Sequence, residues 1–166
     1  MAIRYLGHTL CAIALTITAA SAWAQDVLVE KNISLALANE AAAAAVQFCR
    51  GKGWRVSATV VDRAGVTKAM QRADGAGPHT VEASRRKAFT ALSARNTTSA
   101  MLDAIQKNPA AANLSMIDGF LILGGGVPIR AGDEVIGAIG VGGAPGGHLD
   151  EQCAQAGIDK ISEQLK

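Results

Sequence analysis

The chain has 166 residues, a length that suits one domain with a sizeable core. Hydrophobic residues make up 49% of it and charged residues 18%, which excludes an intrinsically disordered chain. The formal net charge is +2, too small for the basic surface that nucleic-acid binding requires, so we expect no nucleic-acid partner.

The N-terminus has the pattern of a secretory signal peptide. Arg4 gives a basic start, residues 10–18 form an apolar run, and Ala22-Trp23-Ala24 is a small-residue cleavage site. We predict cleavage after Ala24, which leaves residues 25–166 as a single periplasmic or secreted domain with no stable membrane insertion. An uncleaved anchor is the alternative, although the apolar run is short for crossing a bilayer.

Two cysteines, Cys49 and Cys153, remain after cleavage, because Cys11 leaves with the signal. They lie near the end of the first expected helix and near the start of the last one, so the thiols meet if those helices pack antiparallel. An oxidising compartment would then favour a disulfide. Two separate buried thiols are the other interpretation.

The sequence after the signal predicts a helix and then a β-hairpin. Small and apolar residues favour a helix that Ser34 or Asn39 caps and that runs to about Arg50, where Gly51-Lys52-Gly53 would end it. Residues 54–61 alternate as a half-buried strand does, residues 62–65 have the composition of a turn, and residues 66–72 form the returning strand.

Two more helices are expected after a loop at residues 74–78. The first opens at His79 or Thr80 and breaks at residues 95–98, where the second starts. Asn108-Pro109 ends the second helix, because the residue before a proline disfavours helical geometry. A loop or partial turn follows at residues 110–116.

The first of these helices carries three consecutive cations, Arg85-Arg86-Lys87. Three successive residues fan over most of a helical turn, so they cannot all serve one site. We interpret them as a solvated helix face, with the alternative that one of them, such as Arg86, pairs with a ligand carboxylate.

Residues 117–151 contain 11 of the 18 glycines and predict a glycine-rich sheet region followed by a helix. A hairpin turn is expected at residues 131–134 and the last helix from about Leu149 to Leu165. The three strands are expected at residues 120–123, 127–129 and 135–141. The element order therefore predicts an α+β fold, with helices packed on a five-stranded antiparallel sheet.

The glycines from Gly140 onward follow a strand and open a helix. Their spacing suggests a dinucleotide fingerprint, but that motif needs a further strand with an acidic residue, and only one helix remains. Glycines on the strand let either a helix or a flat ligand come close. Backbone amides in the turn could bind an anion, or the turn could have no ligand. The candidate ligand-binding glycines are Gly140, Gly142, Gly143, Gly146 and Gly147.

Two histidines, His79 and His148, remain after cleavage, and each lies between a Gly- or Pro-rich loop and a helix. Either could ligate a metal or a haem iron, or carry a proton near neutral pH. The alternative is a surface histidine without a ligand. The sequence has no GxSxG, CxxC or HxxxH pattern, so residue chemistry alone assigns no reaction.

Several segments, taken in order, resemble one family. The chain is similar to the GlcG/HbpS family of haem-binding proteins, also called haem-degrading, over about residues 30–165. The C-terminal domain of the corrinoid adenosyltransferase of propanediol utilisation is similar too. The segments that carry the resemblance are Val60-Val61-Asp62-x-x-Gly65, Arg72-x-Asp74-Gly75-Ala76, Arg86-Lys87-Ala88-x-Thr90-Ala91, Gly124-Gly125-Gly126-Val127-Pro128, Ile136-Gly137-x-x-Gly140-Val141-x-Gly143 and Asp150-Glu151-x-x-Ala154.

The resemblance implies a profilin-like sheet with helices on both faces, homo-oligomers, and binding of haem or another tetrapyrrole by some members. Our first hypothesis is an exported haem-binding protein for storage, sensing or detoxification. His79 or His148 would then ligate the iron, and Arg86 or the glycine amides would hold a propionate. The alternatives are an enzyme that degrades haem or acts on a small carboxylate of glycolate metabolism, and a ligand-free structural or signalling partner. Gly142 stands where the family commonly has Ser, so the hydroxyl is missing here and any site that relies on it is weakened.

Overall fold

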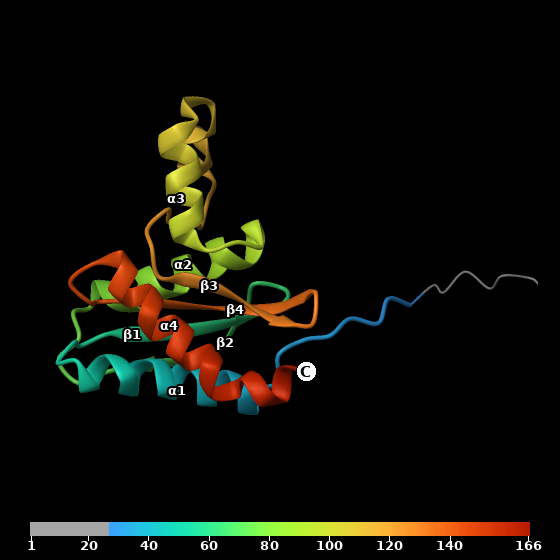
Figure 1. Cartoon of the computed structure of the whole chain (residues 1–166), viewed down its shortest axis with the longest axis vertical. Coiled ribbons are helices and arrows are strands. Elements are labelled where there is room, and N and C mark those ends of the chain that lie inside the picture. Colours follow the sequence, from blue (N-terminus) through green and yellow to red (C-terminus); the bar gives the residue numbers. More distant parts are fainter. Residues whose placement is uncertain (1–26) are drawn as a thin grey trace, which may run out of the picture.

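A computed structural model describes residues 27–166, and the predicted signal peptide with its cleavage site lies outside this range. The described residues form a layered α+β structure, in which one sheet lies between helices on its two faces (Figure 1). Helix α2 (His79–Ala94) covers one face, and α1 (Leu35–Gly51) with α4 (Gly147–Ile161) covers the other. Helix α3 (Thr98–Lys107) rises away from this body (Figure 1).

Within residues 27–166 the sheet has four antiparallel strands in the order β2-β1-β4-β3. The predicted hairpin over residues 54–72 is present as β1 and β2, and the glycine-rich region supplies β3 and β4. The strands are β1 (Ser57–Asp62), β2 (Thr67–Arg72), β3 (Gly126–Ala131) and β4 (Glu134–Gly142). Two short 3-10 helices complete the elements, η1 (Pro109–Met116) and η2 (Ser162–Leu165).

The predicted fifth strand at residues 120–123 does not form, which corrects the five-stranded sheet. This segment packs on α2 instead of pairing with a strand. The Phe120 ring meets the Phe89 ring edge-to-face with centroids 6.2 Å apart, and the Leu121 amide donates to the Thr90 hydroxyl at 2.8 Å. Its apolar residues therefore serve contacts with a helix, an alternative that a short apolar run cannot exclude.

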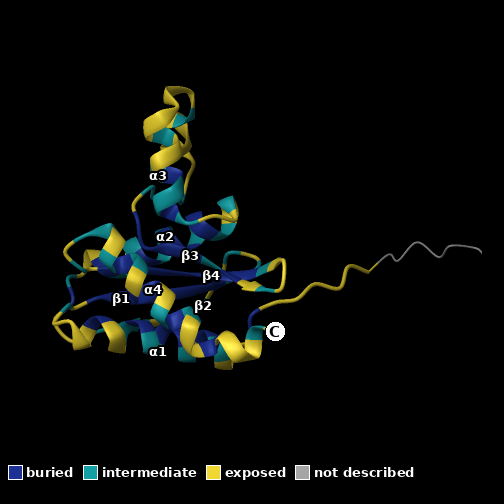
Figure 2. Cartoon of the chain, in the orientation of Figure 1, coloured by how far each residue is buried: buried dark blue, intermediate teal, exposed yellow. Residues whose placement is uncertain are grey.

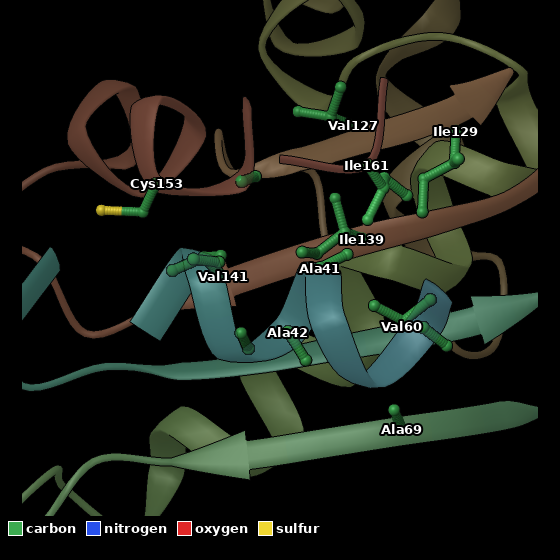
Figure 3. Close-up of a cluster of buried hydrophobic side chains, with 14 of the residues drawn as sticks. Ala41, Ala42, Val60, Ala69, Val127, Ile129, Ile139, Val141, Cys153 and Ile161 are labelled. Carbon is green, nitrogen blue, oxygen red and sulfur yellow. The ribbon is translucent and has the colours of Figure 1, made fainter. Parts of the chain in front are cut away.

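The main core lies between the sheet and the pair α1 and α4. Small residues let these helices approach closely: Ala41 and Ala42 of α1 are fully buried, and the α4 residue Gly157 leaves no room for a Cβ against the Ala41 carbonyl. A disulfide between Cys49 and Cys153 joins the two helices, with Cα atoms 5.6 Å apart. Figure 3 shows the alanines of α1 beside the branched side chains of the sheet.

The opposite face of the sheet is made of small and hydroxyl-bearing residues, and α2 lies directly on it. A Cβ at Gly140 would collide with the Ser84 carbonyl and the Ala88 amide nitrogen of α2. The Thr59 and Ser84 hydroxyls pair across this contact at 2.7 Å. A helix, rather than a flat ligand, therefore fills the space above the strand glycines.

Burial follows this layering. Buried residues concentrate in the two central strands and on the inner sides of the helices, whereas the end of α3 and most of η1 are exposed (Figure 2). Among residues 27–166, we find no helix with the length and apolar character needed to span a membrane.

Candidate functional site

A buried ion pair lies where α2, the end of β4 and the start of α4 meet. The Lys87 ammonium lies 2.7 Å from the Asp150 carboxylate and donates to the Val141 carbonyl at 3.0 Å. Lys87 is 1% exposed and Asp150 3%. A Cβ at Gly125 would fall 2.7 Å from the Asp150 Cβ and 3.1 Å from the Lys87 Nζ, so a glycine leaves the space that this pair occupies.

The interpretation of Arg85-Arg86-Lys87 as a solvated face is wrong for Lys87. Arg85 does lie at the surface, where it pairs with Glu82 at 2.7 Å. The Arg86 guanidinium donates to the Phe120 carbonyl and so ties α2 to the following loop. A signal for Lys87 was present in the sequence, because Thr80, Ser84, Lys87 and Ala91 share one helix face that is otherwise made of small residues.

Two opposing effects act on the pKa of the Asp150 carboxyl. Burial raises the pKa of the Asp150 carboxyl, and the Lys87 ammonium opposes that rise. The Ala144 amide also donates to this carboxylate, at 2.9 Å. Because both partners are buried, we assign this pair to holding the helices and turns together rather than to contact with a ligand.

The candidate glycines allow close backbone packing, and the turn that they form binds a carboxylate of the protein itself. The Ala144 amide within the turn binds the protein's own Asp150 carboxylate. Gly143, with a φ of 125°, packs on the backbone of Arg55. Gly147 contacts the backbone of Gly124. Gly142 lies beneath α2, and Gly146 lies beside the His148 ring.

The two histidines lie at the first turns of helices on opposite faces of the sheet, so the structure does not bring them together. The His79 imidazole folds back over Gly77, and the residue is exposed. His148 is also exposed, but it lines an open hollow of about 290 Å³. The hollow is lined by Ser99, His148, Glu151, Gln152 and Gln155.

A residue that lines the hollow beside His148 has one buried polar atom without a partner in the described range. Glu151 lies one helical turn after His148, and its Oε2 is buried without a hydrogen bond within residues 27–166. No group of three or more His, Cys, Asp or Glu residues in that same range is arranged to hold a metal ion. A haem iron makes a smaller demand, because the porphyrin supplies the equatorial ligands and a single axial histidine suffices.

Comparisons with known proteins agree with this fold. A family model described as "Haem degrading protein HbpS-like" matches residues 33–159. An uncharacterized 15.0 kDa protein of the dhaT-dhaS intergenic region of Citrobacter freundii is 36% identical over 107 residues, which cover 63% of this chain and 75% of that protein.

Solved structures extend the likeness. A double mutant of HbpS from Streptomyces reticuli has a TM-score of 0.78 at 39% identity, covering 87% of this chain and 97% of that one. The ORFY protein of Klebsiella pneumoniae has a TM-score of 0.79 at 31% identity, covering 84% and 97%. The PduOC protein, solved as a haem complex, has a TM-score of 0.70 at 23% identity, covering 78% and 95%, and shows the fold alone.

Proposed function

The chain belongs to the HbpS-like family of haem-degrading proteins, and from that premise we propose that it binds haem with His148 as the iron ligand. The observation that carries the assignment is that His148 lines an open hollow together with Glu151, whose Oε2 has no partner among residues 27–166, whereas the His79 ring lies over Gly77. A surface that receives the macrocycle, with one axial nitrogen donor, is the minimum that haem binding requires.

The neighbours of His148 support this role. A metal-bound histidine usually donates its second ring N–H to a carboxylate or a carbonyl, which fixes the ring orientation. Glu151 lies three residues later on the same helix face and has a buried oxygen without a partner in the described range. The Gln152 amide supplies a hydrogen-bond donor for a propionate, whereas the Gln155 amide already donates to Asp159 and the Ser99 hydroxyl pairs with that of Thr97. Arg86 is a less suitable propionate partner, because it already binds the Phe120 carbonyl.

A second copy of the chain would complete the pocket. A hollow of about 290 Å³ is at the small end of ligand pockets, about 300–1,000 Å³, so it cannot enclose a macrocycle by itself. Elsewhere on the described surface, the end of η1 and the residue after it expose large apolar side chains, with Met116 78% and Ile117 45% exposed. We therefore propose a homo-oligomer, in which a neighbouring subunit covers these side chains and the haem. Sedimentation of the wild-type chain and of Met116→Lys tests the proposed homo-oligomer. If both chains sediment as monomers, the homo-oligomer is contradicted.

We further propose that the chain acts after export, in haem storage, sensing or detoxification. The Cys49–Cys153 disulfide supports an oxidising compartment.

The family description also names haem degradation, so turnover of haem is the second candidate function. Incubation of the haem complex with ascorbate separates the two. A Soret band that persists for hours supports storage or sensing, and its steady loss to an open-chain product supports an enzyme.

The test of the proposed site is a haemin titration followed by absorption in the Soret region. Wild type and His79→Ala should give a saturable, shifted band. His148→Ala should lose the shift, with at least about tenfold weaker binding, since one coordinate bond to iron is removed. His79→Ala is the matched control, because both histidines lie exposed at a helix start. An unshifted, non-saturable spectrum in wild type would refute haem binding, and a loss in His79→Ala instead would refute the ligand assignment.

A further inference from the structure

A second hollow, of about 460 Å³, carries an excess of positive charge. We call it the arginine hollow. It is bounded by the end of α1, the following loop, and the loop after β2. Its lining includes three arginines and one acid, together with the half-buried Trp54. The lining residues are Val46, Arg50, Gly53, Trp54, Arg55, Arg72, Ala73 and Asp74.

Two of the three guanidinium groups are available to a ligand. Within residues 27–166, neither Arg50 nor Arg55 has a side-chain hydrogen bond or a salt bridge. Arg72 donates to the Ala76 carbonyl. The charge facing the hollow is therefore three cations against Asp74, a net +2.

A larger hollow of the described chain has a different charge balance. It has a volume of about 650 Å³ and lies at the other end of the strands, beside the two hairpin turns. It is lined by three arginines and three acids, a net charge of zero. Arg63 there pairs with Glu30 at 3.2 Å and with Glu134 at 3.3 Å. Of these two hollows, the arginine hollow is therefore the one that combines an excess of positive charge with unpaired guanidinium groups.

The backbone fixes the walls of the arginine hollow. Gly75, with a φ of 74°, makes the turn after β2, and the Arg55 side chain crosses this turn. A Cβ at position 75 would lie 3.2 Å from the Arg55 Cδ, so the glycine lets the arginine stem lie close. The Trp54 amide donates to the Cys49 carbonyl at 3.0 Å, which fixes the Trp54 backbone against the end of α1. Guanidinium groups bind oxyanions through paired, charge-assisted hydrogen bonds, so two of them at one hollow suit a ligand with two negative charges.

We propose that the arginine hollow binds a small organic dianion, either a dicarboxylate or a phosphate monoester. Arg50 and Arg55 hold the anionic oxygens, and the Trp54 ring is the wall for the apolar part of the ligand. The site is separate from the hollow at His148, with which it shares no lining residue, so it does not depend on haem binding.

The experiment uses tryptophan fluorescence. Trp54 is the only tryptophan of residues 25–166, so in the exported chain the signal reports on this wall; a chain that retains residues 1–24 carries Trp23→Phe. Succinate and phenyl phosphate are titrated at constant ionic strength, with NaCl as the blank. We expect saturable quenching by at least one of them, and the stronger of the two identifies carboxylate or phosphate as the preferred group. NaCl should give none.

Variants locate the site. Arg50→Gln with Arg55→Gln should weaken binding at least about tenfold, since two charge-assisted hydrogen-bonding groups are lost. Asp74→Asn removes the single acid and should tighten binding severalfold, which keeps the test informative if the double variant folds poorly. Arg85→Gln removes a surface arginine outside the hollow and should change nothing, and His148→Ala should likewise leave dianion affinity unchanged. Absence of saturable quenching, or equal affinity in wild type and the double variant, would overturn the proposal.

Discussion

Replacing Lys87 with Met should strongly destabilise the fold at neutral pH. The substitution keeps an unbranched apolar side chain, one atom shorter, but removes the ammonium that lies 2.7 Å from Asp150 and the hydrogen bond to the Val141 carbonyl. Removal of one partner from a buried pair leaves an uncompensated charge, at a cost of about 3–5 kcal/mol. The free energy of unfolding in urea at pH 7 measures the loss.

The matched control is Arg85→Met, two residues earlier on the same helix. Its ion pair with Glu82 is at the surface and contributes at most about 1 kcal/mol. The double variant Lys87→Met with Asp150→Asn removes both charges and should recover about 1–3 kcal/mol relative to Lys87→Met alone. The structural role of the Lys87–Asp150 pair is contradicted if Lys87→Met costs no more free energy of unfolding than Arg85→Met does. It is also contradicted if the cost of the double variant equals the sum of the costs of its two single substitutions.

The pH dependence of this variant follows from the carboxyl. Burial raises the pKa of the Asp150 carboxyl in the folded protein. A group whose folded pKa is raised contributes stability that is fully present below its unfolded pKa, about 3.9 for Asp. That stability is lost as the pH rises through the folded pKa. Lys87→Met removes the ammonium that opposes the rise, so in the variant this pKa is higher still and stability falls over a wider range of pH. The gap between wild type and variant should therefore narrow toward pH 4. A gap that is constant from pH 4 to pH 7 would contradict the assignment.

Three further changes test the packing, each by the free energy of unfolding. Reduction of the Cys49–Cys153 disulfide, which spans 104 residues, should cost about 2–5 kcal/mol, and an unchanged urea midpoint in dithiothreitol would contradict a structural role. Gly140→Ala forces a Cβ into α2 and should cost about 3 kcal/mol or more. Gly51→Ala is the control, because open space surrounds this position, and it should be neutral or stabilising by up to about 1 kcal/mol. Equal effects of the two substitutions would count against the helix–sheet contact. Thr98→Val leaves a buried amide without its acceptor, at about 1–3 kcal/mol, and a neutral result would show that water replaces the hydroxyl.

Elements with a clear local period could be predicted from the sequence. Alternation over residues 54–61 gave the first strand, and the turn at residues 62–65 set the hairpin. The segment at residues 120–123 shows where local reasoning fails, because a run of four apolar residues satisfies a strand and a helix-packed loop equally well. Its position is decided by Phe89 and Thr90, which lie about 30 residues earlier.

The candidate site was predictable only in its parts. The sequence singled out His148 as a residue before a helix, but the hollow also needs Ser99, which comes from a distant helix. Lys87 was obscured by its two charged neighbours, and Asp150 had no local feature that marks a buried anion. Long-range packing chose among residues of similar local character, and no spacing rule encodes that choice.

The most direct test of haem ligation by His148 is chemical rescue. In His148→Gly, the imidazole side chain is replaced by open space at the surface of α4, and free imidazole can enter from solvent. We expect the haemin complex of this variant to lack the histidine-ligated Soret band and to regain it when imidazole is added at millimolar concentration, while His79→Gly keeps the wild-type band throughout. A wild-type band in His148→Gly without imidazole would contradict the account and place the iron elsewhere on the chain.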